Sequence, residues 1–258
     1  MPITTEQIKE LRDQTGVSVM QCKKALEEAG GNMEKALLVL KKKSAEIASK
    51  KSEREAKDGL VVIKTDGGKA VLSVLNCETD FVSRNNDFIT LANQIADLAL
   101  NDGAESAKAK ARDMISPVVQ KIGENIQFNK ILTLEGENIG SYVHNGKAGV
   151  AVALAGGTPE LAREIAMHIA AMKPEFAKKE DIAADVVNAV KELFVKEVDA
   201  SNKPQDIKDK MMQGKIDAYF KERTLSEQPF IKNPDITVGG LLAQNKASMK
   251  NFIYSTLA

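Results

Sequence analysis

Residues 139–155, IGSYVHNGKAGVAVALA, hold the pattern that decides the fold. Two aliphatic runs, 139–144 and 148–155, flank Asn145-Gly146, the dipeptide that most strongly favours a two-residue hairpin turn. Thr158-Pro159 then opens a helical pattern, because proline suits the first position of a helix. The stretch therefore predicts a β-hairpin followed by a helix.

The same order of elements occurs once earlier in the chain. Two aliphatic runs, 60–65 and 70–75, flank the turn signal Asp66-Gly67-Gly68, and residues 86–100 carry one apolar helical face. A helix at 104–121 and a strand at 126–134 follow. We therefore predict an α+β fold, in which two related subdomains each contain a small antiparallel sheet covered by helices.

The first 40 residues predict three short helices in a compact bundle, since their apolar residues recur at helical spacing. Thr4 with Gln7 and Ser18 with Gln21 have the spacing of capping boxes. Residues 41–58 are instead rich in lysine, glutamate, serine and alanine without a continuous apolar stripe. Such a composition is typical of a solvated helical linker.

Two further amphipathic helices are predicted at 182–199 and 205–222. The four residues 201–204 that join them are too few for anything but an antiparallel helical hairpin. A short helix from Thr237 and a strand at 247–254 follow, so the hairpin is inserted into the second subdomain. The predicted domains are 1–54 (three helices and linker), 55–139 (first core subdomain), 140–180 with 226–258 (second core subdomain) and 181–225 (inserted hairpin).

The composition limits the classes of partner. The chain has 36 basic and 36 acidic residues, so no net field favours nucleic acid or anionic lipid. No stretch approaches the length of a spanning helix, and no secretion signal is found. Cys22 and Cys77 are isolated and are expected to be buried thiols rather than bridges or nucleophiles. We therefore expect a cytoplasmic protein that binds neither nucleic acid nor a membrane directly.

Motifs of enzyme chemistry are missing from the sequence. Gly67-Gly68-Lys69-Ala70 is too short and wrongly ended for a phosphate-binding loop. Two histidines and two isolated cysteines do not suffice for a closed zinc site, so neither a metal nor a cofactor is expected. His168 lies among apolar helical positions and is expected to be packed with its ring nitrogen satisfied. His144 beside the hairpin turn is either a turn residue or a partner contact.

Residues 79–88, TDFVSRNNDF, form a predicted loop between the strand that ends near Cys77 and the helix that begins near Asn86. Asp80 beside Phe81 places a hydrogen-bond acceptor next to a bulky apolar ring, which suits a wedge that enters a partner's crevice. An interpretation of equal weight is that Phe81 fills the core. The residues alone leave both interpretations open.

This loop closely resembles the signature of the bacterial elongation factor Ts family. Residues 10–31 also match the family's amino-terminal signature, although many members have an acid at the position of Gln21. Further matches occur in the family's order along the chain: Lys121–Ile126, Gly140-Ser141-Tyr142 with His144, His168–Ala171 and Gln228-Pro229-Phe230.

The resemblance implies a ubiquitin-associated-like three-helix domain, a core of two α+β subdomains and an inserted antiparallel coiled coil. It further implies a non-enzymatic guanine nucleotide exchange factor that binds elongation factor Tu, GDP-bound or nucleotide-free, in a 1:1 or 2:2 complex and promotes GDP release during translation elongation. Self-association through the helical hairpin stays open. The residues implied to contact elongation factor Tu and to displace its Mg and GDP are Thr79, Asp80, Phe81, Val82, His144, Ile122, Gly123, Lys23, Met20 and Ile231.

Two departures limit what the resemblance implies. Lys232 stands where some members have a methionine, so no site is carried over to it. Many members continue past the position of Ala258 into a further helical module, so we expect weaker exchange than in those longer members.

Two other functions stay open from the residues. A generic adaptor would use the three-helix domain to bind a ubiquitin-like or ribosome-associated partner without any effect on nucleotide. An enzyme would use His144 and Asp80 as general acid and base, although these residues lie in different predicted subdomains.

Overall fold

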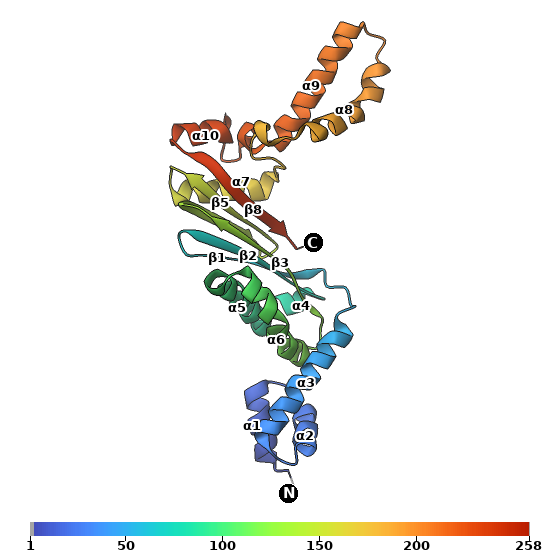
Figure 1. Cartoon of the computed structure of the whole chain (residues 1–258), viewed down its shortest axis with the longest axis vertical. Helices are drawn as coiled ribbons and strands as arrows, with labels where there is room; N and C mark the ends of the chain where they lie inside the picture. Colours follow the sequence, from blue (N-terminus) through green and yellow to red (C-terminus); the bar gives the residue numbers. More distant parts are fainter. Residues whose placement is uncertain (1–2, 258) are drawn as a thin grey trace. The chain divides into compact units, whose positions relative to one another are not determined.

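A computed structural model describes residues 3–257 and shows helices interleaved with short strands (Figure 1). In chain order the elements are α1 (Thr5–Thr15), α2 (Val19–Glu28), α3 (Met33–Lys51), β1 (Asp58–Thr65), β2 (Lys69–Cys77), α4 (Asp80–Ser83), α5 (Asn86–Asp102), α6 (Ala104–Ile122), β3 (Ile126–Glu135), β4 (Asn138–His144), β5 (Ala148–Ala155), α7 (Pro159–Met172), the 3-10 turn η1 (Lys179–Asp181), α8 (Ala184–Asp199), α9 (Gln205–Arg223), the 3-10 turn η2 (Leu225–Glu227), β6 (Pro229–Phe230), β7 (Asn233–Thr237), α10 (Val238–Gln244) and β8 (Ser248–Thr256).

Within residues 3–257 the strands form three small sheets, in the orders β1-β2-β3, β4-β5-β8 and β6-β7. The predicted α+β fold class is therefore confirmed. The described residues divide into two compact units, one formed by 3–133, 143–149 and 255–257 and the other by 134–142 and 150–254. No helix in the range 3–257 combines the length and the apolar character that a membrane span requires.

The first three helices form a small bundle in the first unit. Both predicted capping boxes are present, because the Thr4 and Ser18 hydroxyls accept the backbone N–H groups of Gln7 and Gln21. Gly16 ends α1 in the left-handed conformation, with φ of 69°. The bundle core consists of Leu11, Val17, Cys22, Ala25, Leu26, Ala36 and Leu40.

The helix predicted after residue 40 is confirmed as far as Lys51, but the prediction that it is a solvated linker is wrong for the side that packs on the core. Helix α3 continues to Lys51, and its second half packs against α6. Ser44 is buried, and Ile47 and Ala48 contact the apolar cluster beneath α5 and α6. The packed face of the second half of α3 consists mostly of serine and alanine. Because these residues are small and only weakly apolar, the sequence shows no continuous apolar stripe there.

Strands β1 and β2 form the predicted hairpin, in antiparallel register from Asp58 opposite Cys77 to Thr65 opposite Ala70. The Asp66 carboxylate closes the turn by accepting the N–H groups of Gly68 and Lys69. Helices α5 and α6 cover one face of this sheet (Figure 1). The apolar cluster between them is built from Leu75, Cys77, Val82, Phe88, Leu91, Ala92, Ile95, Ala111, Ile115, Val119 and Ile126.

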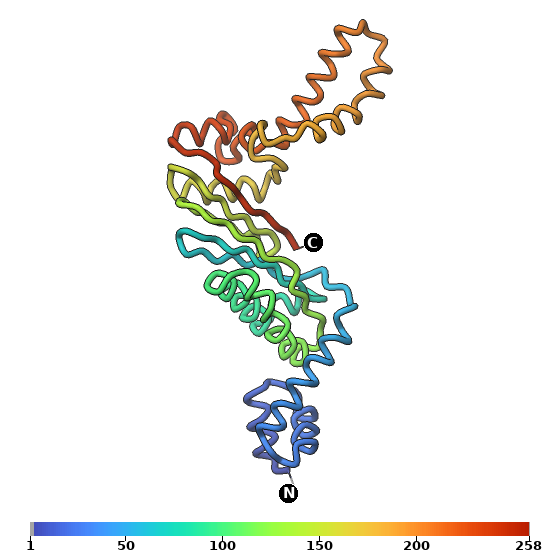
Figure 2. Tube along the Cα trace, viewed as in Figure 1, coloured from blue at the N-terminus to red at the C-terminus, as the bar shows by residue number. Residues whose placement is uncertain are grey.

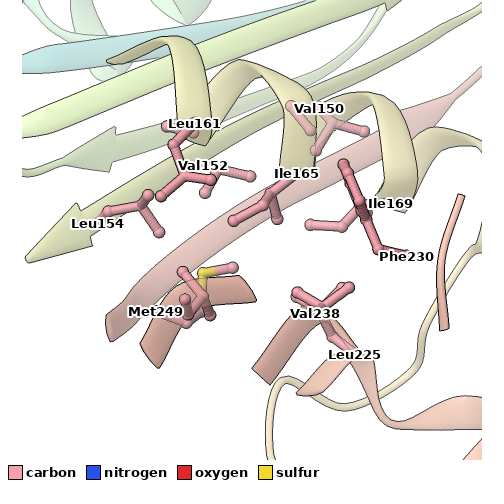
Figure 3. Packing of buried hydrophobic residues seen from close by; sticks show 13 residues of the cluster. Val150, Val152, Leu154, Leu161, Ile165, Ile169, Leu225, Phe230, Val238 and Met249 are labelled. Carbon is pink, nitrogen blue, oxygen red and sulfur yellow. The ribbon is translucent and has the colours of Figure 1, made fainter. Parts of the chain in front are cut away.

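In the second unit, helix α7 begins at the predicted cap, since the Thr158 hydroxyl accepts the N–H of Leu161 and Pro159 takes the first position. Figure 3 shows Leu161, Ile165 and Ile169 of α7 pointing into a core shared with β5, β8 and α10. The predicted short helix capped by Thr237 is α10, and the predicted last strand is β8.

Helices α8 and α9 form the predicted antiparallel hairpin, which folds back on itself after Asp199 (Figure 2). Its core contains Val190, Ile216 and Phe220. The two chain segments at its base are paired: the N–H groups of Glu175 and Phe176 donate to the carbonyl of Arg223, and the N–H of Leu225 donates to the carbonyl of Phe176. The hairpin therefore leaves and rejoins the unit at one place.

Residues 229–230 lie in a small strand pair that the sequence did not predict. Pro229–Phe230 pairs with Asn233–Thr237 as a small antiparallel ribbon, β6-β7. The pattern is hard to recognise because β6 has two residues and begins with proline, which lacks a backbone donor.

Candidate functional site

Phe81 is the most exposed large apolar side chain among the described residues, with 84% of its surface accessible. The interpretation that Phe81 fills the core is therefore wrong. Its neighbours Val82 and Ser83 are buried instead, and Val82 takes the place in the apolar cluster beside Cys77 and Phe88. The aromatic ring thus projects from a segment that is itself fixed to the core.

The predicted loop at 79–88 contains a turn of helix, α4, that sequence patterns did not reveal. The Thr79 carbonyl accepts the N–H of Ser83, and the Ser83 hydroxyl donates to the carbonyl of Asp80. Asp80 forms an ion pair with Arg84, at 3.0 Å, on the outer side of this turn. A four-residue helix carries no apolar periodicity, so only the buried Val82 and the exposed Phe81 distinguish it from a loop.

Ile122 and Gly123 lie beside this turn, at the end of α6. Gly123 terminates the helix with φ of 88°, and its carbonyl accepts a hydrogen bond from the Lys51 ammonium group. Ile122 is half-buried against the same cluster as Val82. Glu124, the next residue, accepts hydrogen bonds from the Thr79 N–H at 3.1 Å and hydroxyl at 2.8 Å. The structure therefore brings Thr79–Val82 and Ile122–Gly123 together.

His144 lies exposed at the end of β4, next to the predicted turn. Asn145 and Gly146 both have positive φ, 51° and 70°, as an Asn-Gly hairpin turn requires. The Asn145 amide lies 3.5 Å from the His144 ring nitrogen Nε2. Both earlier interpretations of His144 remain compatible with this position, because a turn residue can also be exposed to a partner.

Asp58 connects this turn with α4. Its carboxylate accepts from the Lys147 ammonium group at 2.5 Å and from the Gly59 N–H at 2.7 Å, and it faces the side chain of Ser83 in α4. Partial burial acts to raise the pKa of Asp58, but these hydrogen bonds outweigh it and the pKa lies below its ordinary value. The turn that carries His144 and the helix that carries Phe81 are thus tied to the same strand.

Met20 and Lys23 lie three residues apart on one face of α2, both exposed. Met20 is 61% exposed, and the Lys23 ammonium group lies 3.9 Å from the carboxylate of Glu27. These two residues form their own surface on the three-helix bundle, and no described contact joins them to α4.

Ile231 lies in the second unit, between β6 and β7, and is 39% exposed. Its backbone N–H donates to Nδ1 of His168 at 3.3 Å, while Nε2 of His168 lies 2.9 Å from the Gln228 side-chain oxygen. The predicted packed histidine is confirmed, since His168 is fully buried with both nitrogens partnered. Burial lowers the pKa of His168, although its bond to Gln228 acts in the opposite direction.

A family model described as "Elongation factor TS" matches residues 78–258. Proteins named "Elongation factor Ts" from Psychromonas ingrahamii and Pasteurella multocida are 42% and 41% identical, and each alignment covers 97% of this chain and 89% or 90% of the relative. The chain belongs to the elongation factor Ts family. A further relative of the same name, from Aeromonas salmonicida, is 39% identical over the same share of the chain. The resemblance drawn from residues 79–88 is therefore confirmed for the chain as a whole.

Glu124 and Asp58 were not among the candidate contact residues that the sequence indicated. Both act on α4 from positions distant in sequence, so spacing alone gave no signal for them. The two cysteines agree with the prediction, since Cys22 and Cys77 are buried free thiols. Burial raises the pKa of Cys77 to about 12, with the nearby Asp58 and Glu124 carboxylates acting in the same direction.

Proposed function

We propose that this protein binds elongation factor Tu and promotes release of its GDP. The observation that carries the proposal is the placement of Phe81: an aromatic ring 84% exposed on a helical turn whose neighbours are buried. A rigid apolar side chain of this kind enters a partner's pocket at little entropic cost. Family membership supplies the identity of the partner.

The mechanism needs no covalent chemistry. A protein that binds the nucleotide-free GTPase more tightly than the GDP-bound form must lower the affinity for GDP by the same factor. In this mechanism Phe81 enters between helices of the nucleotide-binding domain, with Asp80, Ile122, Gly123 and His144 around it. The displaced helices disturb the magnesium and phosphate site, so GDP dissociates faster and GTP rebinds.

Met20 and Lys23 would contact the same domain from the three-helix bundle, and Ile231 would lie near a second domain of elongation factor Tu. We propose that the protein acts in the cytoplasm, as a translation factor and not as an enzyme. The balance of 36 basic and 36 acidic residues supports a protein partner over nucleic acid.

Stopped-flow release of a fluorescent GDP analogue from elongation factor Tu of the same organism tests the proposal. Rising concentrations of the protein, with excess unlabelled GDP, are expected to accelerate release until it saturates. Binding of elongation factor Tu in a pull-down without faster release would support the adaptor interpretation instead. Absence of both binding and acceleration by a folded sample would refute the proposed function.

A further inference from the structure

Thr79 occupies the N-cap of α4 but does not cap it. An N-cap threonine normally accepts a backbone N–H two or three residues later with its hydroxyl oxygen, and no such bond exists here. Its hydroxyl and its backbone N–H both donate instead to the carboxylate of Glu124, at 2.8 Å and 3.1 Å. The start of the helical turn is therefore held by a residue 45 positions away in the chain.

A second carboxylate makes the reverse connection. Glu78 accepts the backbone N–H of Asn125 at 2.6 Å and lies 3.5 Å from the guanidinium of Arg54. The side chain of Asn125 is buried and donates to the carbonyl of Arg54 at 2.6 Å. Residues 78–79 and 124–125 thus exchange hydrogen bonds in both directions, and each exchange uses a carboxylate as acceptor.

Hydrogen bonds to carboxylates are stronger than those between neutral groups. Two bonds accepted by one carboxylate also fix the orientation of the donor residue. The Glu124 segment is itself restrained, since Gly123 ends α6 in the left-handed conformation and its carbonyl receives the Lys51 ammonium group. Phe81 follows Thr79 by two residues on a single helical turn. The orientation of Thr79 therefore sets the direction in which the Phe81 ring projects.

We propose that Glu124 is a positioning residue for Phe81. It acts through its two hydrogen bonds to Thr79, here called the Glu124–Thr79 clamp, which hold the start of α4 in place. Glu78 supports it from the opposite side by holding Asn125. The effect of the clamp on GDP release rests on the proposed exchange function. The clamp itself is a property of the free protein. Its loss leaves Phe81 present but without a fixed direction, so binding must first order the turn.

The clamp is tested first without any partner, by hydrogen exchange of the backbone amides of residues 79–85. Glu124→Ala is expected to accelerate exchange of the Thr79 and Ser83 amides by about tenfold, because a charged acceptor is lost. Thr79→Val, which removes only the hydroxyl bond, is expected to give a smaller acceleration, and Thr79→Ser none. Glu105→Ala, which removes a surface carboxylate paired with Lys108 on α6, is the matched control.

The consequence is tested by GDP release from elongation factor Tu in a double-mutant cycle. Glu124→Ala is expected to lower the acceleration several-fold when Phe81 is present and to have no further effect in Phe81→Ala. A purely structural defect caused by Glu124→Ala would instead lower the activity equally in the protein with Phe81 and in the Phe81→Ala protein. Thr79→Val gives the same cycle with a smaller perturbation, so a poorly folded Glu124→Ala does not prevent a decision.

Unchanged amide exchange in Glu124→Ala and Thr79→Val would overturn the inference, as would equal losses in the two Phe81 backgrounds. A different outcome is that amide exchange accelerates in the variants as expected while the unmodified protein fails to accelerate GDP release from elongation factor Tu. In that case the clamp is supported and the proposed function is wrong. The two failures are therefore distinguishable.

Discussion

Replacement of Phe81 by alanine is expected to separate partner binding from folding, because the side chain is exposed while Val82 and Ser83 after it are buried. Because 84% of the residue is exposed, its ring contributes little to the stability of the free protein. The unfolding free energy from urea titration is expected to change by less than about 0.5 kcal/mol. Any larger functional loss therefore belongs to the complex.

The size of that loss follows from the exposed surface. Complete burial of a phenylalanine side chain is worth up to about 3 kcal/mol. Since 84% of Phe81 is still available for burial, a partner pocket that encloses it gains at most about 2.5 kcal/mol. At 1.4 kcal/mol per factor of ten, removal of the ring is expected to lower the efficiency of GDP release by up to about 60-fold.

The assay is stopped-flow release of labelled GDP, in which the initial slope against protein concentration gives the efficiency. Leu193→Ala is the matched control, since Leu193 is also an exposed apolar residue, 67% accessible, but lies on the helical hairpin. The prediction is refuted if Phe81→Ala promotes GDP release as efficiently as the unmodified protein. It is also refuted if Leu193→Ala lowers this efficiency as much as Phe81→Ala does.

Three further predictions concern stability. Gly140→Ala is expected to destabilise the protein by about 2–3 kcal/mol in urea titration, because a Cβ on β4 would lie 2.1 Å from the backbone nitrogen of Arg163 in α7; a change below about 1 kcal/mol would contradict the observed packing. Gly214→Ala, in the middle of α9, is expected to raise stability by about 0.5–1 kcal/mol, because an added Cβ would meet no atom within 4 Å outside the neighbouring helix backbone; thermal melting that shows no gain would argue against a regular helix there. The folded-state pKa of Asp58 is lowered, so its stabilising effect is present above the unfolded-state pKa and is lost as pH falls through the lower folded value. Lys147→Met is therefore expected to lower the melting temperature at pH 6 more than at pH 3, and an equal decrease at both pH values would show that the ion pair contributes nothing.

Elements whose ends carry local signals were predictable from the sequence. Capping boxes fixed the starts of α1 and α2, and the Asn145-Gly146 turn fixed the β4-β5 hairpin, because these signals depend on neighbouring residues only. The second half of α3 was misjudged since Ser44 and Ala48, though packed, do not count as an apolar stripe. Its burial is decided by α6, which lies far away in the chain.

The stretch from Thr79 to Val82 was selected from the sequence as a candidate contact, but its geometry was not predictable. The sequence left open whether Phe81 points inward or outward. That choice depends on Val82, which fills the core in its place, and on Glu124, which holds Thr79. Both are tertiary contacts, so no periodicity within residues 79–88 records them.

The paired segments at the base of the α8–α9 hairpin make this insertion a self-contained stem. Because Glu175 and Phe176 are bonded to Arg223, and Leu225 to Phe176, the chain closes across the stem ahead of α8 and at the last residue of α9. Helical turns can therefore be added to or removed from both arms together without altering the sheet or α7. A shortened arm, or a foreign helical pair of matching spacing, is therefore expected to be accepted on the same base.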